Sequence, residues 1–218
     1  MAVGSRRRGI VLLLHVQFVA RHSLGKVSHG SHYVGLGLLM LALALWLMPT
    51  PLARRRFVLG GTLLFMGAGY VCAAISKLVA RGLRWPSGGH LWLWINEKSV
   101  DHLSTLGQYE LNVLQRLCLE HWWLATSFLA LGLLSEASGF LLWFTRTRTA
   151  ITLALIGLHL GIYWSMGILF DTYVYQLALV GLPLPRLIDA LLASRLAAAP
   201  AGRDTRVAAA PSTPNRGS

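Results

Sequence analysis

The chain has 218 residues, of which 55% are hydrophobic and only 13% are charged, and its mean hydropathy is +0.55. These values are typical of multi-span helical membrane proteins rather than of globular domains. The formal net charge of +12 does not indicate a nucleic-acid partner, because the basic residues stand in short clusters between apolar runs.

Residues 1–32 are expected to form a basic head and a short apolar first segment. Arg6, Arg7 and Arg8 precede an apolar run over residues 9–20, which His15 and Gln17 interrupt. A signal peptide is one interpretation of this start, but no small-x-small cleavage site follows it. A short, imperfect first span fits the pattern better.

Residues 33–193 carry the strongly apolar part of the chain. Its stretches predict membrane spans at residues 33–48, 57–79, 121–144, 149–170 and 173–193. Together with the first segment, they predict an all-α, polytopic bundle of five to six transmembrane helices. The second of the five spans contains glycines that allow close helix packing, at Gly60, Gly61, Gly67 and Gly69.

Two regions between and after these spans differ from them in composition. Residues 80–120 form a long non-spanning segment, and the alternating Trp and Leu of His90–Asn96 predict that it lies at the membrane interface. Residues 194–218 consist largely of Ala, Pro, Arg and Ser, and we expect a disordered cytoplasmic tail. Cys72 and Cys118 are too few for a disulfide framework and are expected to be structural thiols.

The distribution of Lys and Arg predicts the orientation. If the spans alternate, thirteen basic residues lie on the side of both termini and six on the other side. The richer side is expected to be cytoplasmic. The chain is therefore predicted to be an integral protein of a bacterial plasma membrane with both termini in the cytoplasm.

Lys77 stands near the far end of the apolar run over residues 57–79. An ammonium group within hydrocarbon costs at least about 2.5–3.5 kcal/mol, so such a lysine is rare and is often functional. The alternative is snorkelling, in which the amine reaches the headgroups. A helix end at Arg81-Gly82 and a rigid turn at Trp85-Pro86 follow Lys77 and favour a site that opens at one membrane face.

Other polar residues fall within or beside the predicted spans. Glu136 lies deep in the third of the five and needs either a proton or a cationic partner. His159 shares a helix face with Thr152 and Tyr163, and His32 lies at the outer mouth of the first. Structural pairing or packing is the alternative for each of these residues. No histidine pair has the i, i+4 spacing of a metal site on one span, and no metal is predicted.

Three blocks resemble one family. YVCAAISKLVARGLRWPSGGHLWLWI is similar to the Lys-Leu segment of the vitamin K-dependent gamma-carboxylases and of their bacterial relatives, the HTTM-domain proteins. LLSEASGFLLWFTRTRTAITLALIGLHLGIYWSMGILFDTYVYQLAL resembles two later spans of that family, with an acidic residue, a short basic turn and a histidine-bearing helix. HGSHYVGLGLLMLAL resembles the opening of an earlier span. The blocks together cover residues 29–182.

The resemblance implies a carboxylase-like lyase chemistry that depends on a reduced quinone. Lys77 would act as the base, His32 would hydrogen-bond the quinone-derived species, and His159 matches a histidine on the later span. We expect the cofactor to lie against the side chains of Tyr70, Trp85, Glu136 and Tyr163. The expected partners are membrane lipid and a peptide or small lipid-soluble substrate.

Two other functions remain open. One is a quinone-linked accessory subunit of the DoxX/MauE type, whose helices carry a similar Lys-Leu segment. The other is a non-enzymatic export or immunity partner, in which Lys77 and Glu136 would form a structural pair. A transporter is disfavoured because the sequence contains no duplicated halves.

Overall fold

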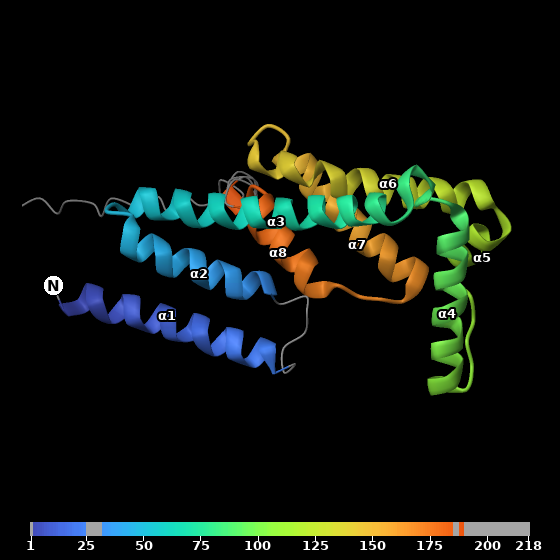
Figure 1. Ribbon diagram of the computed structural model, residues 1–218, viewed down its shortest axis with the longest axis horizontal. Helices are drawn as coiled ribbons and strands as arrows, with labels where there is room; N and C mark the ends of the chain where they lie inside the picture. Colours follow the sequence, from blue (N-terminus) through green and yellow to red (C-terminus); the bar gives the residue numbers. More distant parts are fainter. Residues whose placement is uncertain (1, 25–31, 185–187, 190–218) are drawn as a thin grey trace, which may run out of the picture. The chain divides into compact units, whose positions relative to one another are not determined.

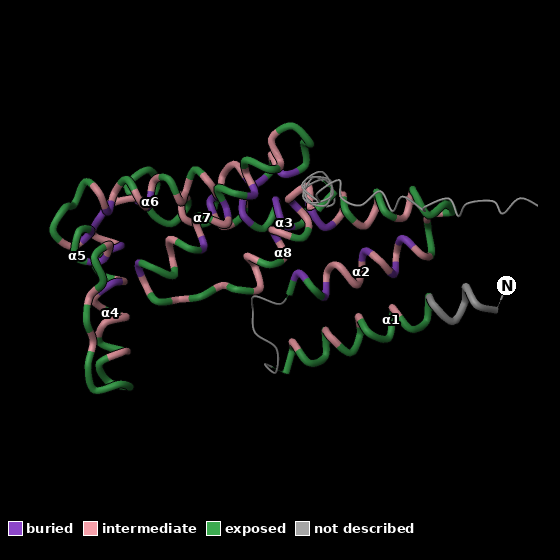
Figure 2. Tube along the Cα trace, turned by 180° about the vertical axis from the view of Figure 1, so that it is seen from behind, coloured by how far each residue is buried: buried purple, intermediate pink, exposed green. Residues whose placement is uncertain are grey.

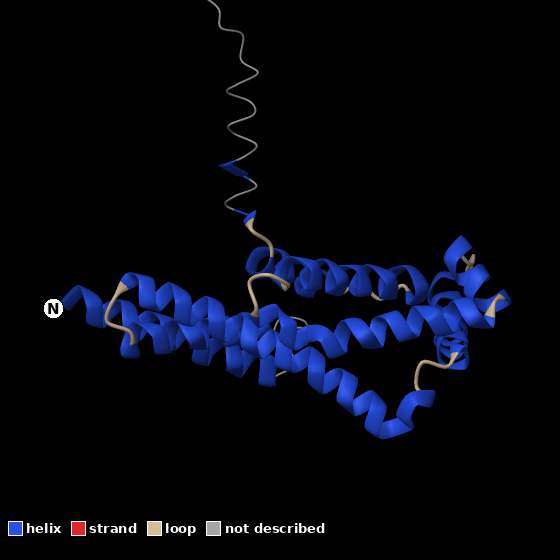
Figure 3. Cartoon of the chain, turned by 90° about the horizontal axis from the view of Figure 1, so that it is seen from above, coloured by secondary structure: helices blue, strands red, loops and turns tan. Residues whose placement is uncertain are grey.

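The computed structural model describes residues 2–24, 32–184 and 188–189, which contain helices and no strands. The helices are α1 (Ala2–Ser23), α2 (His32–Leu47), α3 (Pro51–Arg81), α4 (Gly88–Leu106), α5 (Val113–Glu120), α6 (Trp122–Ala137), α7 (Arg148–Met166) and α8 (Asp171–Gly181) (Figures 1 and 3). Two 3-10 turns, η2 (Gly82–Arg84) and η3 (Ser138–Trp143), extend α3 and α6. The predicted all-α class is confirmed for these residues.

The chain divides into a compact unit of residues 1–182 and a second unit of residues 183–218. Of the second unit only residues 183, 184, 188 and 189 are described, and the predicted tail over residues 194–218 lies outside the described residues. The helices discussed below all belong to the first unit.

Among the described residues, three helices are long and apolar enough to cross a membrane: Pro51–Arg84, Trp122–Trp143 and Arg148–Met166. They correspond to the second, third and fourth of the five predicted spans. Helix α2 is apolar but has only 16 residues, fewer than the roughly 20 that a full span needs. The chain thus contains helices of membrane-spanning type. The predicted total of five to six spans stays a prediction.

The ends of α3 have identifiable causes. Thr50 caps its start, because the side-chain hydroxyl accepts a hydrogen bond from the amide of Ala53, and Pro51 occupies the first turn. At the far end Gly82 has φ 60°, a conformation that stops the helix as the Arg81-Gly82 pattern predicted. Arg54 lies inside α3 and donates from Nε to the carbonyl of Met48, 2.9 Å away, beyond the end of α2.

Two predicted spans differ from the observed helices. Helix α7 ends at Met166 instead of Phe170, because Gly167 follows in the left-handed region with φ 71°. Helix α8 has 11 residues and ends at Gly181, well short of the predicted end at residue 193. Most of residues 185–193 lie outside the described part of the chain, so the fifth span is not tested there.

Within the first unit α1, α3 and α7 run in one direction, and α2, α6 and α8 run in the opposite one (Figure 1). The buried residues of α3, η3, α7 and α8 form one core, and Figure 2 shows buried positions along these elements. Gly67 and Gly139 let α3 and η3 meet closely, because a Cβ on Gly67 would lie 2.6 Å from the carbonyl oxygen of Gly139. This contact brings the end of α6 against α3.

The predicted interfacial segment is helical. Helix α4 runs across the end of α3 in Figure 1, and residues of α4, α5 and α6 form a second core, which includes Leu91, Ile95, Cys118, Ala125 and Leu129. Asn112 and Gln115 form a reciprocal capping box at the start of α5. The interfacial position of α4 and α5 stays a prediction.

Candidate functional site

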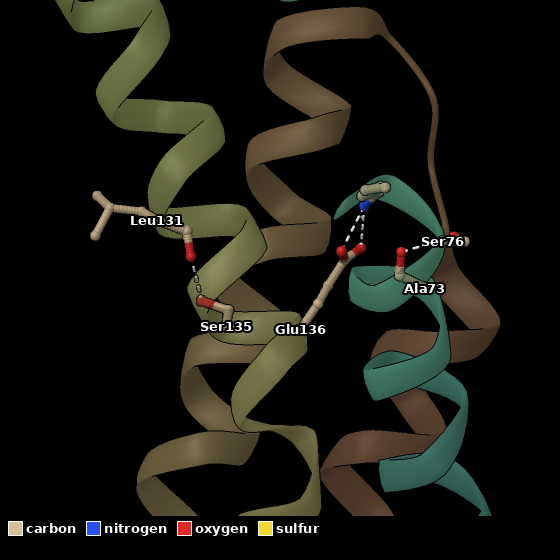
Figure 4. Close-up of polar contacts among 6 residues, drawn as sticks. Ala73, Ser76, Leu131, Ser135 and Glu136 are labelled. Atoms are coloured by element: carbon tan, nitrogen blue, oxygen red, sulfur yellow. Dashed lines mark hydrogen bonds and ion pairs between the residues drawn. The ribbon is translucent and has the colours of Figure 1, made fainter. Parts of the chain in front are cut away.

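Lys77 and Glu136 form an ion pair between α3 and α6. Nζ of Lys77 lies 2.5 Å from both carboxylate oxygens, and Figure 4 shows Glu136 reaching from α6 towards α3. The Glu136 side chain is only 9% exposed, whereas that of Lys77 is 28% exposed. The two charges neutralise each other, so neither stands alone within the apolar bundle.

The surroundings of Lys77 leave part of its ammonium group available. An ammonium has three N–H donors, and the two carboxylate oxygens of Glu136 occupy two of them. Nζ also lies 4.8 Å from the centre of a Trp85 ring, a distance at which a cation is attracted to the ring face. One donor therefore remains for another acceptor.

Lys77 lines a largely apolar pocket of about 420 Å³. The wall is built mainly from α4, α6 and α7 and includes Trp85, Leu91, Trp94, Phe128, Leu129, Leu158, Ile162 and Met166. Ser135 and Ser165 also line it, but their hydroxyls donate to carbonyls one turn earlier in their own helices. Lys77 is the charged side chain among these lining residues, and its ammonium has an N–H donor beyond the two oxygens of Glu136.

His159 belongs to a neighbouring cluster of aromatic side chains. Its Nε2 lies 2.7 Å from the hydroxyl of Tyr70, and both residues are buried. The ring stacks on Tyr173 with 5.1 Å between centres and lies 5.4 Å from the ring centre of Phe170. Tyr70 precedes Lys77 by two helical turns on α3, so this cluster lies about 10 Å from the ion pair on the same helix face.

The predicted site residues divide among four places. Lys77 and Trp85 share the apolar pocket, with Glu136 bound to Lys77, while Tyr70 pairs with His159. His32 approaches the Tyr173 hydroxyl at 3.3 Å and lines a different pocket, beside α1 and α2. Tyr163 lines a third pocket, near Asn112 and Gln115. Neither His32 nor His159 lines the pocket of Lys77.

Two residues that the sequence did not single out take part in these contacts. Tyr173 lies between His32 and His159 and contacts both rings. Trp94 lines the pocket of Lys77 and lies 6.0 Å from Trp85 between ring centres. The sequence signal for Tyr173 was a polar hydroxyl at the start of an apolar stretch. The signal for Trp94 was the alternation of Trp and Leu around it.

Among the described residues no group of three or more His, Cys, Asp and Glu side chains could hold a metal ion. No protein-family model, curated protein or solved structure matches the chain. The resemblance to the gamma-carboxylases therefore stays a prediction, and the geometry of the site carries the functional argument.

Proposed function

We propose that the chain is a membrane protein that binds a neutral, lipid-soluble ligand of the quinone class in the pocket beside Lys77. The observation that carries this proposal is the Lys77–Glu136 pair at the wall of a largely apolar pocket, because the ammonium has three N–H donors and Glu136 offers it two oxygens. An anionic ligand would compete with Glu136 for the ammonium. A neutral carbonyl acceptor uses the spare donor without breaking the pair.

The shape and lining of the pocket support the same ligand class. A volume of about 420 Å³ lies in the range of small-molecule sites, which are mostly apolar with a few polar groups that fix orientation. Trp85 and Trp94 offer flat aromatic faces against which a planar ring packs well. The apolar side chains of α6 and α7 suit an isoprenoid tail.

The pair also supports proton transfer with a reduced ligand. A lysine acts as a base only after its ammonium has lost a proton, and Glu136 is bound where it can accept that proton. Lys77 would then take a hydroxyl proton from the bound hydroquinone. A bound quinone supplies the redox chemistry, and a carboxylase-like reaction is the specific extension that the family resemblance implies.

A second candidate function rests on the two-oxygen geometry of the pair. Lys77 and Glu136 join α3 to α6 and could serve as a structural link in a non-enzymatic membrane protein. A variant with Lys77→Glu and Glu136→Lys separates the two proposals. A purely structural pair predicts normal stability for the swapped protein. The ligand site predicts loss of binding, because the amine would then extend from position 136 on α6, which does not line the pocket.

Binding is tested by lipid extraction and mass spectrometry of the purified protein, followed by titration with a short-tail benzoquinone and a short-tail naphthoquinone, monitored by tryptophan fluorescence. We expect saturable binding that weakens about tenfold or more in Lys77→Met, since a hydrogen bond to a charged group contributes roughly 1.5–3 kcal/mol. Tyr163→Phe changes a different pocket and is the matched control. The absence of any saturable binding to the wild-type protein would overturn the proposal.

A further inference from the structure

Three side chains on α7 and α8 carry buried polar atoms that have no hydrogen-bond partner in the described part of the chain. These atoms are Nδ1 of His159, Oγ1 of Thr152 and both amide atoms of Gln176. Thr152 is 0% exposed and His159 is 7% exposed. Buried polar groups are normally paired with protein or with ordered water, and an unpaired one bears the full penalty of desolvation. Four such atoms in one region therefore indicate that something else satisfies them.

The three side chains follow one another along the bundle. Thr152 and His159 are seven residues apart on α7, so they lie on one face about 10 Å apart. Helix α8 runs back along α7, with Tyr173 stacked on His159. At the other end of α8, a Cβ on Gly181 would overlap the Thr152 hydroxyl. Gln176 lies between these two contacts, one turn from Tyr173.

The row continues beyond His159 towards the ion pair. Nε2 of His159 is hydrogen-bonded to Tyr70, and Tyr70 lies two turns from Lys77 on α3. Polar groups therefore extend from Thr152, one turn beyond Arg148, to Tyr70, which lies about 10 Å along α3 from Lys77.

We propose that internal water molecules join Thr152, Gln176 and His159 into a chain that conducts protons to and from the Lys77–Glu136 pair. One buried water molecule makes two to four hydrogen bonds and can join polar groups that do not reach one another directly. Hydroxyl and imidazole groups accept as well as donate, so they relay a proton in either direction, while the amide of Gln176 holds the water molecules in line.

Transfer through the histidine leaves the protein unchanged. A proton that arrives from water at Nδ1 of His159 releases the proton of Nε2 to the Tyr70 oxygen, and the tyrosine hydroxyl passes its own proton to a further water molecule between Tyr70 and Glu136. The return of these groups to their starting tautomers completes the transfer of one proton. No bond to carbon changes and no electron moves. The conduction does not depend on the proposed quinone ligand.

The test uses the full-length protein in liposomes that enclose a pH-sensitive dye, with a potassium diffusion potential to drive proton uptake. We expect the wild-type protein to take up protons clearly faster than protein-free vesicles. Thr152→Val keeps the side-chain shape and Gln176→Leu keeps its bulk, and each should slow uptake at least about tenfold, as expected when one link of a transfer chain is lost. His159→Phe should reduce uptake to the level of protein-free vesicles.

Ser127→Ala is the matched control, because the Ser127 hydroxyl donates to a carbonyl of its own helix α6 and lies outside the row. It should conduct like the wild-type protein. Unchanged helical content and a monodisperse elution profile establish that each variant is folded. Wild-type uptake no faster than that of empty vesicles would overturn the proposal, and so would wild-type rates in both Thr152→Val and Gln176→Leu. Quinone binding is measured separately, so failure of one proposal is distinguishable from failure of the other.

Discussion

Removal of either member of the Lys77–Glu136 pair should destabilise the protein, and the two removals should have unequal effects. Lys77→Met leaves the carboxylate of Glu136, whose side chain is 9% exposed, without its cation. An uncompensated buried charge costs about 3–5 kcal/mol. Glu136→Met leaves Lys77, which is 28% exposed and whose long stem can carry the amine outward, so we expect a loss of about 1–2 kcal/mol.

The double variant Lys77→Met/Glu136→Met should lie within about 1 kcal/mol of the wild-type protein, because replacement of both partners by apolar groups removes the desolvation cost along with the attraction. The two single losses therefore should not add. Methionine suits both positions because its unbranched side chain adapts to irregular space.

The free energy of unfolding is measured by titration with a denaturing detergent in mixed micelles, followed by circular dichroism. Lys98 and Asp101 provide the matched control, since their 2.7 Å ion pair is exposed on α4. Asp101→Asn should cost no more than about 1 kcal/mol, as is usual for surface pairs. The reasoning is refuted if Lys77→Met and Glu136→Met each lower the free energy of unfolding as little as Asp101→Asn does, and if the two losses add in the double variant.

Three further predictions concern other contacts. Gly139→Ala places a Cβ 2.8 Å from Tyr70 and should cost about 1–3 kcal/mol of unfolding free energy, whereas Gly37→Ala meets nothing within 4 Å and should not destabilise α2. Asn112→Ala removes the capping box and should cost about 1 kcal/mol in the same titration. Burial raises the pKa of the Cys118 thiol, so in a Cys72→Ser protein maleimide labelling at pH 7–9 should stay slow until the protein is unfolded; fast labelling of the folded protein would contradict the burial.

Much of the helical architecture could be predicted from local features of the sequence. Pro49 and Pro51 mark the boundary between α2 and α3, and Gly82 marks the end of α3, because proline and glycine act on the backbone at their own positions. Lys77 stood out because a lysine conflicts with its apolar neighbours. The sequence left two states open for Glu136, a protonated carboxyl group or a pair with a cation, and the structure pairs it with Lys77.

The partners of the polar residues could not be predicted in this way. Lys77 and Glu136 join α3 to α6, Gly67 and Gly139 join α3 to η3, and both contacts link positions far apart in the sequence. The hydrogen bond between Tyr70 and His159 spans 89 positions and joins α3 to α7, whose buried residues share one core with η3. Side-chain periodicity places a residue on a helix face, but it does not identify the helix that faces it.

The presence of Glu136 changes what Lys77 can do. A lone buried lysine is driven to the neutral amine by desolvation, and it then binds a cation or an acid. Lys77 bound to Glu136 stays neutral as a pair in either arrangement of the shared proton, so a small displacement of that proton converts a hydrogen-bond donor into a base. Tyr70 and His159 lie about 10 Å from this pair along α3 and belong to the route by which we propose that the proton leaves. The acid is therefore as important to the proposed chemistry as the lysine.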